Sequence, residues 1–489
     1  MGKRFQYIVF SVALISSALF HILNNHYLAN ENPEALRSGI TVHTNDDASY
    51  IAPVENFLQG KGWKSNAVGK AAYTTRTPGY GLLYLPARFF FSQNNALLAL
   101  VIFQVLLFAF SITQVPAILT ALLLNKKWKK ILTLSFALLP MFYGFLSYTL
   151  TEAVTPSLLI IIVAMLVKGK PGLGKQFILW FLLSFLILVR PPLIVWMLAI
   201  PIFYLPLLKR NIIRLLGASI IVLTPTAIWQ LHLYNVTGEF QGLHPIYQDD
   251  SNTVYRPPHK AIWNFHKSWG QTGPEFHNTI DFLASAARYN RDRDDAVIQT
   301  MNIVPARVKS LVSEDSLALN YGNYYDILQS QANEFRSEAP VAGLSEKEKE
   351  LIAYFDRVEK RYSKSDFFYS QIIVPSQVFK TLALHSNLSL FVFQKPWRGN
   401  LIMEGLRLVC FANHTLAFYI FLLSIFVLFL NRNALIIIVP TACYLGYLCF
   451  IQRGIEERYT LPFLIPMIAV SAKTLELVYR RSIHLMKGK

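Results

Sequence analysis

The sequence predicts an all-α membrane protein with about ten transmembrane helices and a large, mainly helical region outside the bilayer. Of its 489 residues, 53% are hydrophobic and only 15% are charged, whereas soluble domains carry about 25% charged residues. The hydrophobic residues are also gathered in runs of about 20, the length that a helix needs to cross a bilayer. Composition therefore excludes a disordered chain, a collagen and a small disulfide-linked domain.

Ten apolar runs are the predicted spans. The first follows Lys3 and Arg4, and no small-residue cleavage site comes after it, so we expect an uncleaved anchor rather than a removed signal peptide. The runs 153–167 and 176–190 are short and need tilt or extension to cross a bilayer. The full set is 5–23, 95–124, 131–150, 153–167, 176–190, 192–207, 212–231, 407–430, 434–452 and 459–478.

The net charge of +17 is confined to one side of this predicted bundle. The short connections on that side hold 17 lysines and arginines and no acidic residue, which leaves 29 residues of each sign elsewhere. Basic residues gather on cytoplasmic loops, so these connections and both chain ends are predicted to be cytoplasmic. They suit contacts with anionic lipid, and no motif indicates a nucleic-acid partner. The connections are 1–4, 125–130, 168–175, 207–214, 431–433 and 479–489.

Three domains follow from this topology. Residues 1–231 form an N-terminal transmembrane module with a first outer loop at 24–94, residues 232–406 form an outer region, and residues 407–489 form the C-terminal helices. Within the outer region, Ser345 and Glu348 predict a capping box at the start of a helix. The three cysteines lie in or beside apolar runs, which indicates no disulfide framework.

Two adjacent aspartates stand in the first outer loop. Asp46 and Asp47 carry like charges, which raise the pKa of one carboxyl group and suit a proton acceptor near neutral pH. Alternatively, Asp46 caps a helix over 48–58 and Asp47 lies in its first turn, although Pro53 weakens this interpretation. Both interpretations stay open, because a capping aspartate can also be a base.

Further polar motifs are predicted at the same outer face. The motifs are Arg76 in Arg-Thr-Pro-Gly-Tyr, which ends at Tyr80; Glu152 in a short turn between two spans; Arg190 at the end of a span; and Arg458 with Tyr459 in Glu-Arg-Tyr-Thr-Leu-Pro. The structural alternative for these arginines is an interfacial side chain that reaches lipid head groups. For Glu152, the alternative is a hydrogen bond to the first loop.

The order of these motifs resembles the GT-C glycosyltransferases. Asp46 and Tyr50 in Asp-x-x-x-Tyr, an amphipathic helix, a Gly-x-Gly turn and the Arg76 motif are similar to the first outer loop of the branch that holds protein O-mannosyltransferases and the lipid A aminoarabinose transferase. Glu152, Arg190 and the Arg-Tyr-x-x-Pro pattern at Arg458 agree with that branch. The resemblance covers the membrane core and the first loop, but not 232–406.

The resemblance implies a sugar donor on a polyprenyl phosphate, an inverting transfer to an acceptor hydroxyl, and an aspartate of the first loop as the base. We expect Asp46 to be that base, with Asp47 as the alternative. Arginine binds phosphate through paired donors, so the expected phosphate-binding residues are Arg76, Arg190 and Arg458. Supporting roles are expected for Tyr50, Tyr80, Glu152 and Tyr459.

No cofactor and no divalent metal are expected. The histidines lack an HExxH-type spacing, and the Asp46-Asp47 pair lacks the further acidic motifs of the oligosaccharyl branch. The expected partners are the lipid bilayer, a polyprenyl-phosphate-linked sugar and a glycan, lipid or protein acceptor. Aromatic and histidine residues of the outer region either pack in a core or stack on a sugar: Trp263, His266, Trp269, His277, Tyr321, Tyr324 and Tyr325.

The expected location is the bacterial inner membrane, with the active site facing the periplasm or the outside. Two alternative functions make different predictions about the sequence. A transporter or flippase of a lipid-linked sugar predicts ionisable residues within several spans and repeated halves, neither of which the sequence shows. A non-catalytic cell-envelope assembly protein would leave Asp46, Arg76 and Arg458 without a role.

Overall fold

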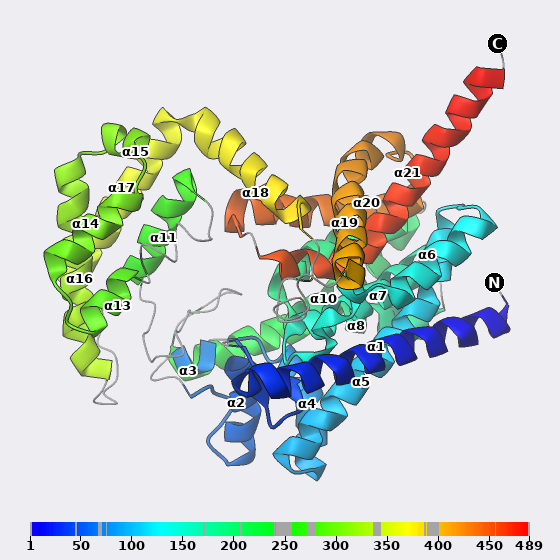
Figure 1. The fold of residues 1–489 in the computed structure, drawn as a ribbon, viewed down its shortest axis with the longest axis horizontal. Coiled ribbons are helices and arrows are strands. Elements are labelled where there is room, and N and C mark those ends of the chain that lie inside the picture. The colour runs from blue at the N-terminus through cyan, green and yellow to red at the C-terminus, as the bar shows by residue number, and fades with distance from the viewer. Residues whose placement is uncertain are drawn as a thin grey trace.

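The computed structural model is almost entirely helical and separates into a membrane bundle and an outer group of helices (Figure 1). Among the described residues, one small sheet pairs β1 (Leu36–Arg37) with β2 (Thr41–Val42) in antiparallel fashion. The structure describes residues 2–44, 46–66, 71–74, 76–169, 172–205, 208–238, 240, 257–270, 280, 282–335, 344–385, 388, 401–454 and 456–487.

Six helices of the described residues are long and apolar enough to cross a membrane, which confirms the predicted fold class. Three shorter apolar stretches accompany them, namely α7 (Thr155–Val167), α8 (Leu173–Val189) and Pro191–Tyr204, where a 3-10 helix leads into α9 (Ala199–Tyr204). The long ones are α1 (Lys3–Glu31), α5 (Gln93–Ala121), α10 (Leu208–Thr237), α19 (Leu401–Val427), α20 (Arg432–Gly446) with its continuation η9 (Tyr447–Gln452), and α21 (Leu461–Lys487).

The predicted run 131–150 is not one continuous helix, so the count of ten spans is not reproduced in that form. Helix α6 (Lys126–Leu138) stops before Pro140, whose ring removes a backbone donor. Short 3-10 turns then carry the chain to Ala153, and the side chains along them are buried. Irregular backbone within a membrane bundle is tolerated only where protein or a water-filled cavity surrounds it. This buried irregular segment holds Glu152.

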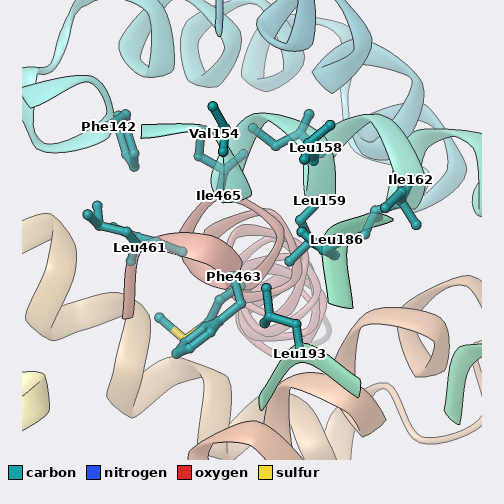
Figure 2. Packing of buried hydrophobic residues seen from close by; sticks show 14 of the residues in the cluster. Phe142, Val154, Leu158, Leu159, Ile162, Leu186, Leu193, Leu461, Phe463 and Ile465 are labelled. Atoms are coloured by element: carbon teal, nitrogen blue, oxygen red, sulfur yellow. The ribbon is translucent and has the colours of Figure 1, made fainter. Parts of the chain in front are cut away.

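Side chains of the apolar core surround the start of α21 (Figure 2). Buried side chains from the 3-10 turns, α7, α8 and the stretch after α8 surround Leu461, Phe463 and Ile465 of α21. Close van der Waals packing of this kind is what holds helices together inside a bilayer. It therefore fixes the position of the turn that precedes α21. The labelled partners are Phe142, Val154, Leu158, Leu159, Ile162, Leu186 and Leu193.

The outer group of helices, here the outer helical unit, has its own core of buried apolar residues. The predicted capping box of Ser345 and Glu348 is confirmed at the start of its last helix. The unit comprises α11 (Pro257–Trp269), α13 (Phe282–Arg288), α14 (Arg293–Ile303), α15 (Ala306–Leu311), α16 (Glu314–Phe335) and α17 (Glu346–Ser365). The turn η8 (Tyr369–Ile373) and α18 (Val374–Ala383) then lead back to the bundle.

The aromatic and histidine residues of this unit pack in its core. His266 Nε2 lies 2.7 Å from the Tyr321 hydroxyl, and His259 Nδ1 lies 2.7 Å from that of Tyr324. Trp269, Tyr321, Tyr324, Tyr325 and His266 are buried and Trp263 packs against them, so packing rather than sugar stacking describes these side chains. His277 lies outside the described residues.

Both ends of the chain lie at the same end of the molecule, opposite the outer helical unit (Figure 1). There Lys130 Nζ lies 6.0 Å from the ring centre of Phe5, and Lys473 Nζ donates to the Leu123 carbonyl at 3.1 Å. The N-terminal segment and the connection 125–130, both predicted to be cytoplasmic by their charge, thus share one end of the bundle.

We expect Lys127→Cys and Lys360→Cys to label from opposite sides of the membrane, since both lysines are exposed, one at each end of the molecule. In a background that lacks the three natural cysteines, an impermeant thiol reagent added outside should modify position 360 and not position 127. Labelling of position 127 alone would invert the topology, and labelling of both in sealed cells would contradict it.

Candidate active site

The carboxylate of Asp46 is held between two arginines from distant parts of the chain. Its Oδ1 lies 2.5 Å from Nη2 of Arg76, and its Oδ2 lies 2.9 Å from Nη2 of Arg458. Helix α2 (Ala48–Leu58) follows, but neither its cap position, Asp47, nor Asp46 makes a side-chain capping bond there. The capping interpretation of Asp46 is therefore wrong, and its side chain, 30% exposed, faces the arginines.

Asp47 points into a different cluster and is fully buried. Its Oδ1 lies 2.8 Å from Nη2 of Arg37 and 3.4 Å from Nε2 of His43, while Thr149 donates its hydroxyl to Oδ2 at 3.0 Å. These contacts tie the small sheet to the irregular segment before Glu152. The two adjacent aspartates thus part at the start of α2, and only Asp46 reaches the arginine cluster.

The two aspartates also differ in pKa. Burial alone would raise the pKa of Asp46, but the charges and hydrogen bonds of Arg76 and Arg458 outweigh it and hold the pKa below its ordinary 3.8. Burial raises the pKa of Asp47, against the opposing charges of Arg37 and His43. The raised pKa that the sequence suggested thus falls on Asp47, and its main cause is burial rather than repulsion between the pair.

Glu152 and Arg190 form a buried ion pair beside this cluster. Arg190 Nη1 lies 2.6 Å from Glu152 Oε1 and donates to the Thr151 hydroxyl at 3.0 Å, while Arg190 Nε lies 3.3 Å from the Tyr444 hydroxyl. Arg190 therefore points into protein and does not reach for lipid head groups. Glu152 pairs with this arginine rather than with the first loop.

Arg458 connects the two groups of charges. Its guanidinium pairs with Asp46 and with Glu456, and its Nε lies 3.8 Å from Glu152 Oε1. Arg458 and Tyr459 lie in η10 (Glu457–Thr460), the 3-10 turn that opens α21. The guanidinium carbon of Arg190 lies 5.3 Å from the ring centre of Tyr459, within cation–π range. The turn before α21 thus connects all three arginines: Arg458 directly, Arg190 through Tyr459, and Arg76 through Asp46.

The ring of Tyr50 packs against the Arg76 guanidinium, and the ring of Tyr80 packs against that of Tyr50. Arg76 lies 5.3 Å from the ring centre of Tyr50, whose ring is in turn 5.3 Å from that of Tyr80. The Tyr80 hydroxyl donates to Oε1 of Gln104 at 2.7 Å, which anchors it to α5. Gly79 opens α4 (Gly79–Phe90) and packs so closely on the backbone of Leu188 that a Cβ there would collide. Glycine therefore lets the Arg76 loop approach the end of α8.

Every residue that the sequence selected as catalytic, phosphate-binding or supporting is thus placed by the structure, and all but Asp47 join one contiguous cluster or its support. Sequence analysis missed several partners in these clusters. Glu456 directly precedes the motif Glu-Arg-Tyr-Thr-Leu-Pro, so its acidic side chain could have been selected from the sequence. Tyr444 lies in an apolar span and Arg37 in an unremarkable loop, so no local pattern marks them. The partners missed are Arg37, Ser49, Thr149, Tyr444 and Glu456.

Among the described residues, no group of three or more His, Cys, Asp or Glu side chains is arranged to hold a metal ion. Asp46 instead meets two cations of the protein itself. Metal-independent chemistry stays a prediction for this site.

Comparison with known proteins returned similar solved structures. No protein-family model and no curated protein match the chain. The oligosaccharyltransferase AglB from Archaeoglobus fulgidus, solved with an inhibitory peptide and a dolichol-phosphate, is 13% identical with a TM-score of 0.43; the match covers 99% of this chain and 51% of AglB. ArnT from Cupriavidus metallidurans, bound to undecaprenyl phosphate, is 14% identical with a TM-score of 0.33, over 97% of this chain and 78% of ArnT.

The chain thus spans about half the length of AglB. Both matched proteins are GT-C enzymes, and the matches do not single out a branch.

Proposed function

We propose that the chain is an inverting glycosyltransferase that moves a sugar from a polyprenyl phosphate to an acceptor hydroxyl at the outer face of the membrane. The observation that carries this proposal is the Asp46 carboxylate, partly exposed and held between Arg76 and Arg458. It combines a proton acceptor with phosphate-binding groups at one end of a membrane bundle.

The donor phosphate would meet Arg76 and Arg458. A polyprenyl tail stays in the bilayer, so its phosphate has to be bound near the membrane surface. The side chains of Arg76 and Arg458 are 26% and 16% exposed and can reach a ligand, whereas Arg190 is buried against Glu152. We therefore assign direct phosphate contact to the first two arginines, and to Arg190 the support of Tyr459 and Glu152.

Phosphate and Asp46 would then compete for the same guanidinium groups. Three arginines already face three carboxylates, those of Asp46, Glu152 and Glu456. An arriving phosphate charge draws Arg76 and Arg458 away from Asp46, which removes the charges that lower its pKa. The donor itself would make Asp46 a stronger base.

The proposed reaction is a single displacement. Asp46 takes the proton of the acceptor hydroxyl while the hydroxyl oxygen bonds to the anomeric carbon. The bond from that carbon to the phosphate oxygen breaks on the opposite face, and its electron pair leaves with the polyprenyl phosphate. The charge that grows on this phosphate is stabilised by Arg76 and Arg458. No nucleotide takes part.

The test uses purified protein in liposomes with undecaprenyl-phosphate-linked mannose or aminoarabinose. We expect saturable binding of undecaprenyl phosphate itself and, with a suitable donor and acceptor, its release as product at a rate that EDTA does not change. Movement of the intact lipid-linked sugar between leaflets without cleavage would support the flippase alternative. Absence of undecaprenyl phosphate binding would contradict the proposal.

We expect Arg458→Ala to weaken the use of donor more than the use of acceptor. Loss of one hydrogen bond to a charged group costs about 1.5–3 kcal/mol, which corresponds to a roughly 10- to 150-fold lower rate at limiting donor. Initial rates at varied donor and varied acceptor separate the two effects. Arg407→Ala is the matched control, because Arg407 forms an exposed pair with Glu404 at the start of α19. An unchanged rate at limiting donor would remove Arg458 from the phosphate site.

A further inference from the structure

A buried arginine joins the outer helical unit to the membrane bundle just before the active-site turn. Arg453 ends η9, is only 4% exposed, and adopts a left-handed backbone conformation with φ of 53°. Such a conformation is unfavourable for a residue with a Cβ and persists only where surrounding contacts impose it. Arg453 stands five residues before Arg458 in the chain.

The Arg453 side chain holds two elements outside the bundle through their backbones. Its Nη2 donates to the Ser370 carbonyl of η8 at 2.7 Å, and its Nη1 donates to the Lys267 carbonyl of α11. Lys267 returns a bond, since its Nζ donates to the Ile451 carbonyl of η9 at 3.2 Å. Two reciprocal contacts thus fasten α11 to the end of this membrane span.

From Arg453 the chain runs directly to the arginine cluster. A Cβ on Gly454 would lie 2.8 Å from Cε2 of Tyr459, so the backbone at Gly454 packs on that ring. The same ring lies 5.3 Å from the guanidinium of Arg190 and 6.0 Å from that of Arg458. Any shift of the backbone at 453–454 is therefore passed to Tyr459 and to the arginines around it.

We propose that Arg453 is a positioning residue that couples the outer helical unit to the donor-phosphate arginines. It fixes the turn that carries Arg458 relative to α11 and η8. A ligand bound at the arginine cluster therefore changes how well α11 is ordered, and a ligand bound at the outer helical unit changes how well the arginine cluster is ordered. This inference rests on the proposed function, because it takes the arginine cluster to be a phosphate site. Coupling between two sites is reciprocal, so phosphate binding must be felt in α11.

The experiment is hydrogen exchange with undecaprenyl phosphate as the probe. In the unchanged protein, we expect the lipid to slow exchange locally at 456–464 and remotely at 257–270. Arg453→Lys keeps the charge but loses the planar fork that reaches two carbonyls. We expect it to keep the local protection, to lose the remote protection, and to bind the lipid about fivefold or more weakly, the lower end of typical coupling.

Two further variants sharpen the test. Arg432→Lys is the matched control, since Arg432 begins the same span at its other end and also donates to backbone carbonyls, those of Ile202 and Phe203. This variant should keep both the remote protection at 257–270 and the lipid affinity of the unchanged protein. Gly454→Ala, which presses on Tyr459 while leaving Arg453 in place, should also weaken lipid binding.

The outcomes separate the two proposals. Local protection without remote protection in the unchanged protein would overturn the coupling and leave the phosphate site standing. A full remote response in Arg453→Lys would overturn the role of Arg453. No protection anywhere would overturn the proposed function, and this inference with it.

Discussion

Asp46→Asn is expected to lower the transfer rate by about 100- to 10,000-fold, the usual cost of losing a general base. Asparagine keeps the size of the side chain, and its one carbonyl oxygen can still accept from Arg76 or Arg458; because the side chain is partly exposed, the fold should be retained. The variant loses the ability to take a proton, together with the negative charge and one of the two arginine hydrogen bonds. Initial rates with saturating donor, together with a thermal denaturation curve in detergent, measure the two effects separately.

Asp47→Asn is the matched comparison for this prediction. Asp47 is fully buried between Arg37, His43 and Thr149, away from the arginine cluster. We expect its variant to denature at a lower temperature but to keep most of its transfer rate per folded molecule. A retained rate in Asp46→Asn with a lost rate in Asp47→Asn would move the base by one residue. Activity in the double variant would refute the mechanism.

The pH dependence follows from the same contacts. Arg76 and Arg458 hold the pKa of Asp46 below 3.8 despite burial, so the carboxylate is ionised at every pH above about 5. The rate at limiting donor, which reports the free protein, should therefore show no ascending limb due to Asp46 between about pH 5 and 8. Because this pKa is depressed in the folded protein, the pairing stabilises the fold above the unfolded pKa and is lost as the pH falls through the folded one. Tyr50, Glu152 and Glu456 also face this cluster.

The sequence predicted the convergence of Asp46, Glu152 and Arg458 because topology alone brings them together. Glu152 and Arg458 lie where apolar runs begin or end on one face, and Asp46 lies in the first outer loop on that face; helices that span one bilayer place such points at one level. Spacing along the chain was irrelevant to this inference: residues 46 and 458 meet in the structure although 412 positions separate them.

The sequence could not predict that the side chains of Asp46 and Asp47 enter different clusters. Neighbouring residues at a helix start point in different directions, and which one meets solvent depends on partners such as Thr149, about a hundred residues away. The broken run 131–150 has a similar cause. Its apolar composition suits a span, but Pro140 and the buried surroundings favour 3-10 turns that only packing reveals.

The Glu152–Arg190 pair should dominate the stability of the site. Removing one member of a buried ion pair typically costs about 3–5 kcal/mol, because the remaining charge is left without its partner. We therefore expect Glu152→Gln and Arg190→Met each to lower the free energy of unfolding by about this amount, measured by titration with a denaturing detergent. Both side chains are buried, and their charged groups lie 2.6 Å apart.

The double variant Glu152→Gln with Arg190→Met is decisive, because it removes both charges and leaves neither unpaired. Replacing a whole buried pair is often close to neutral, so the double variant should recover much of the stability that either single variant loses. Glu346→Gln with Lys349→Met, an exposed pair on α17, should change stability by less than about 1 kcal/mol in any combination. If the two single losses simply added, the pair would not be coupled. A stable double variant that transfers no sugar would show that the pair serves the reaction by orienting Tyr459 and Arg458. A double variant that is stable and fully active would show that the pair serves only folding.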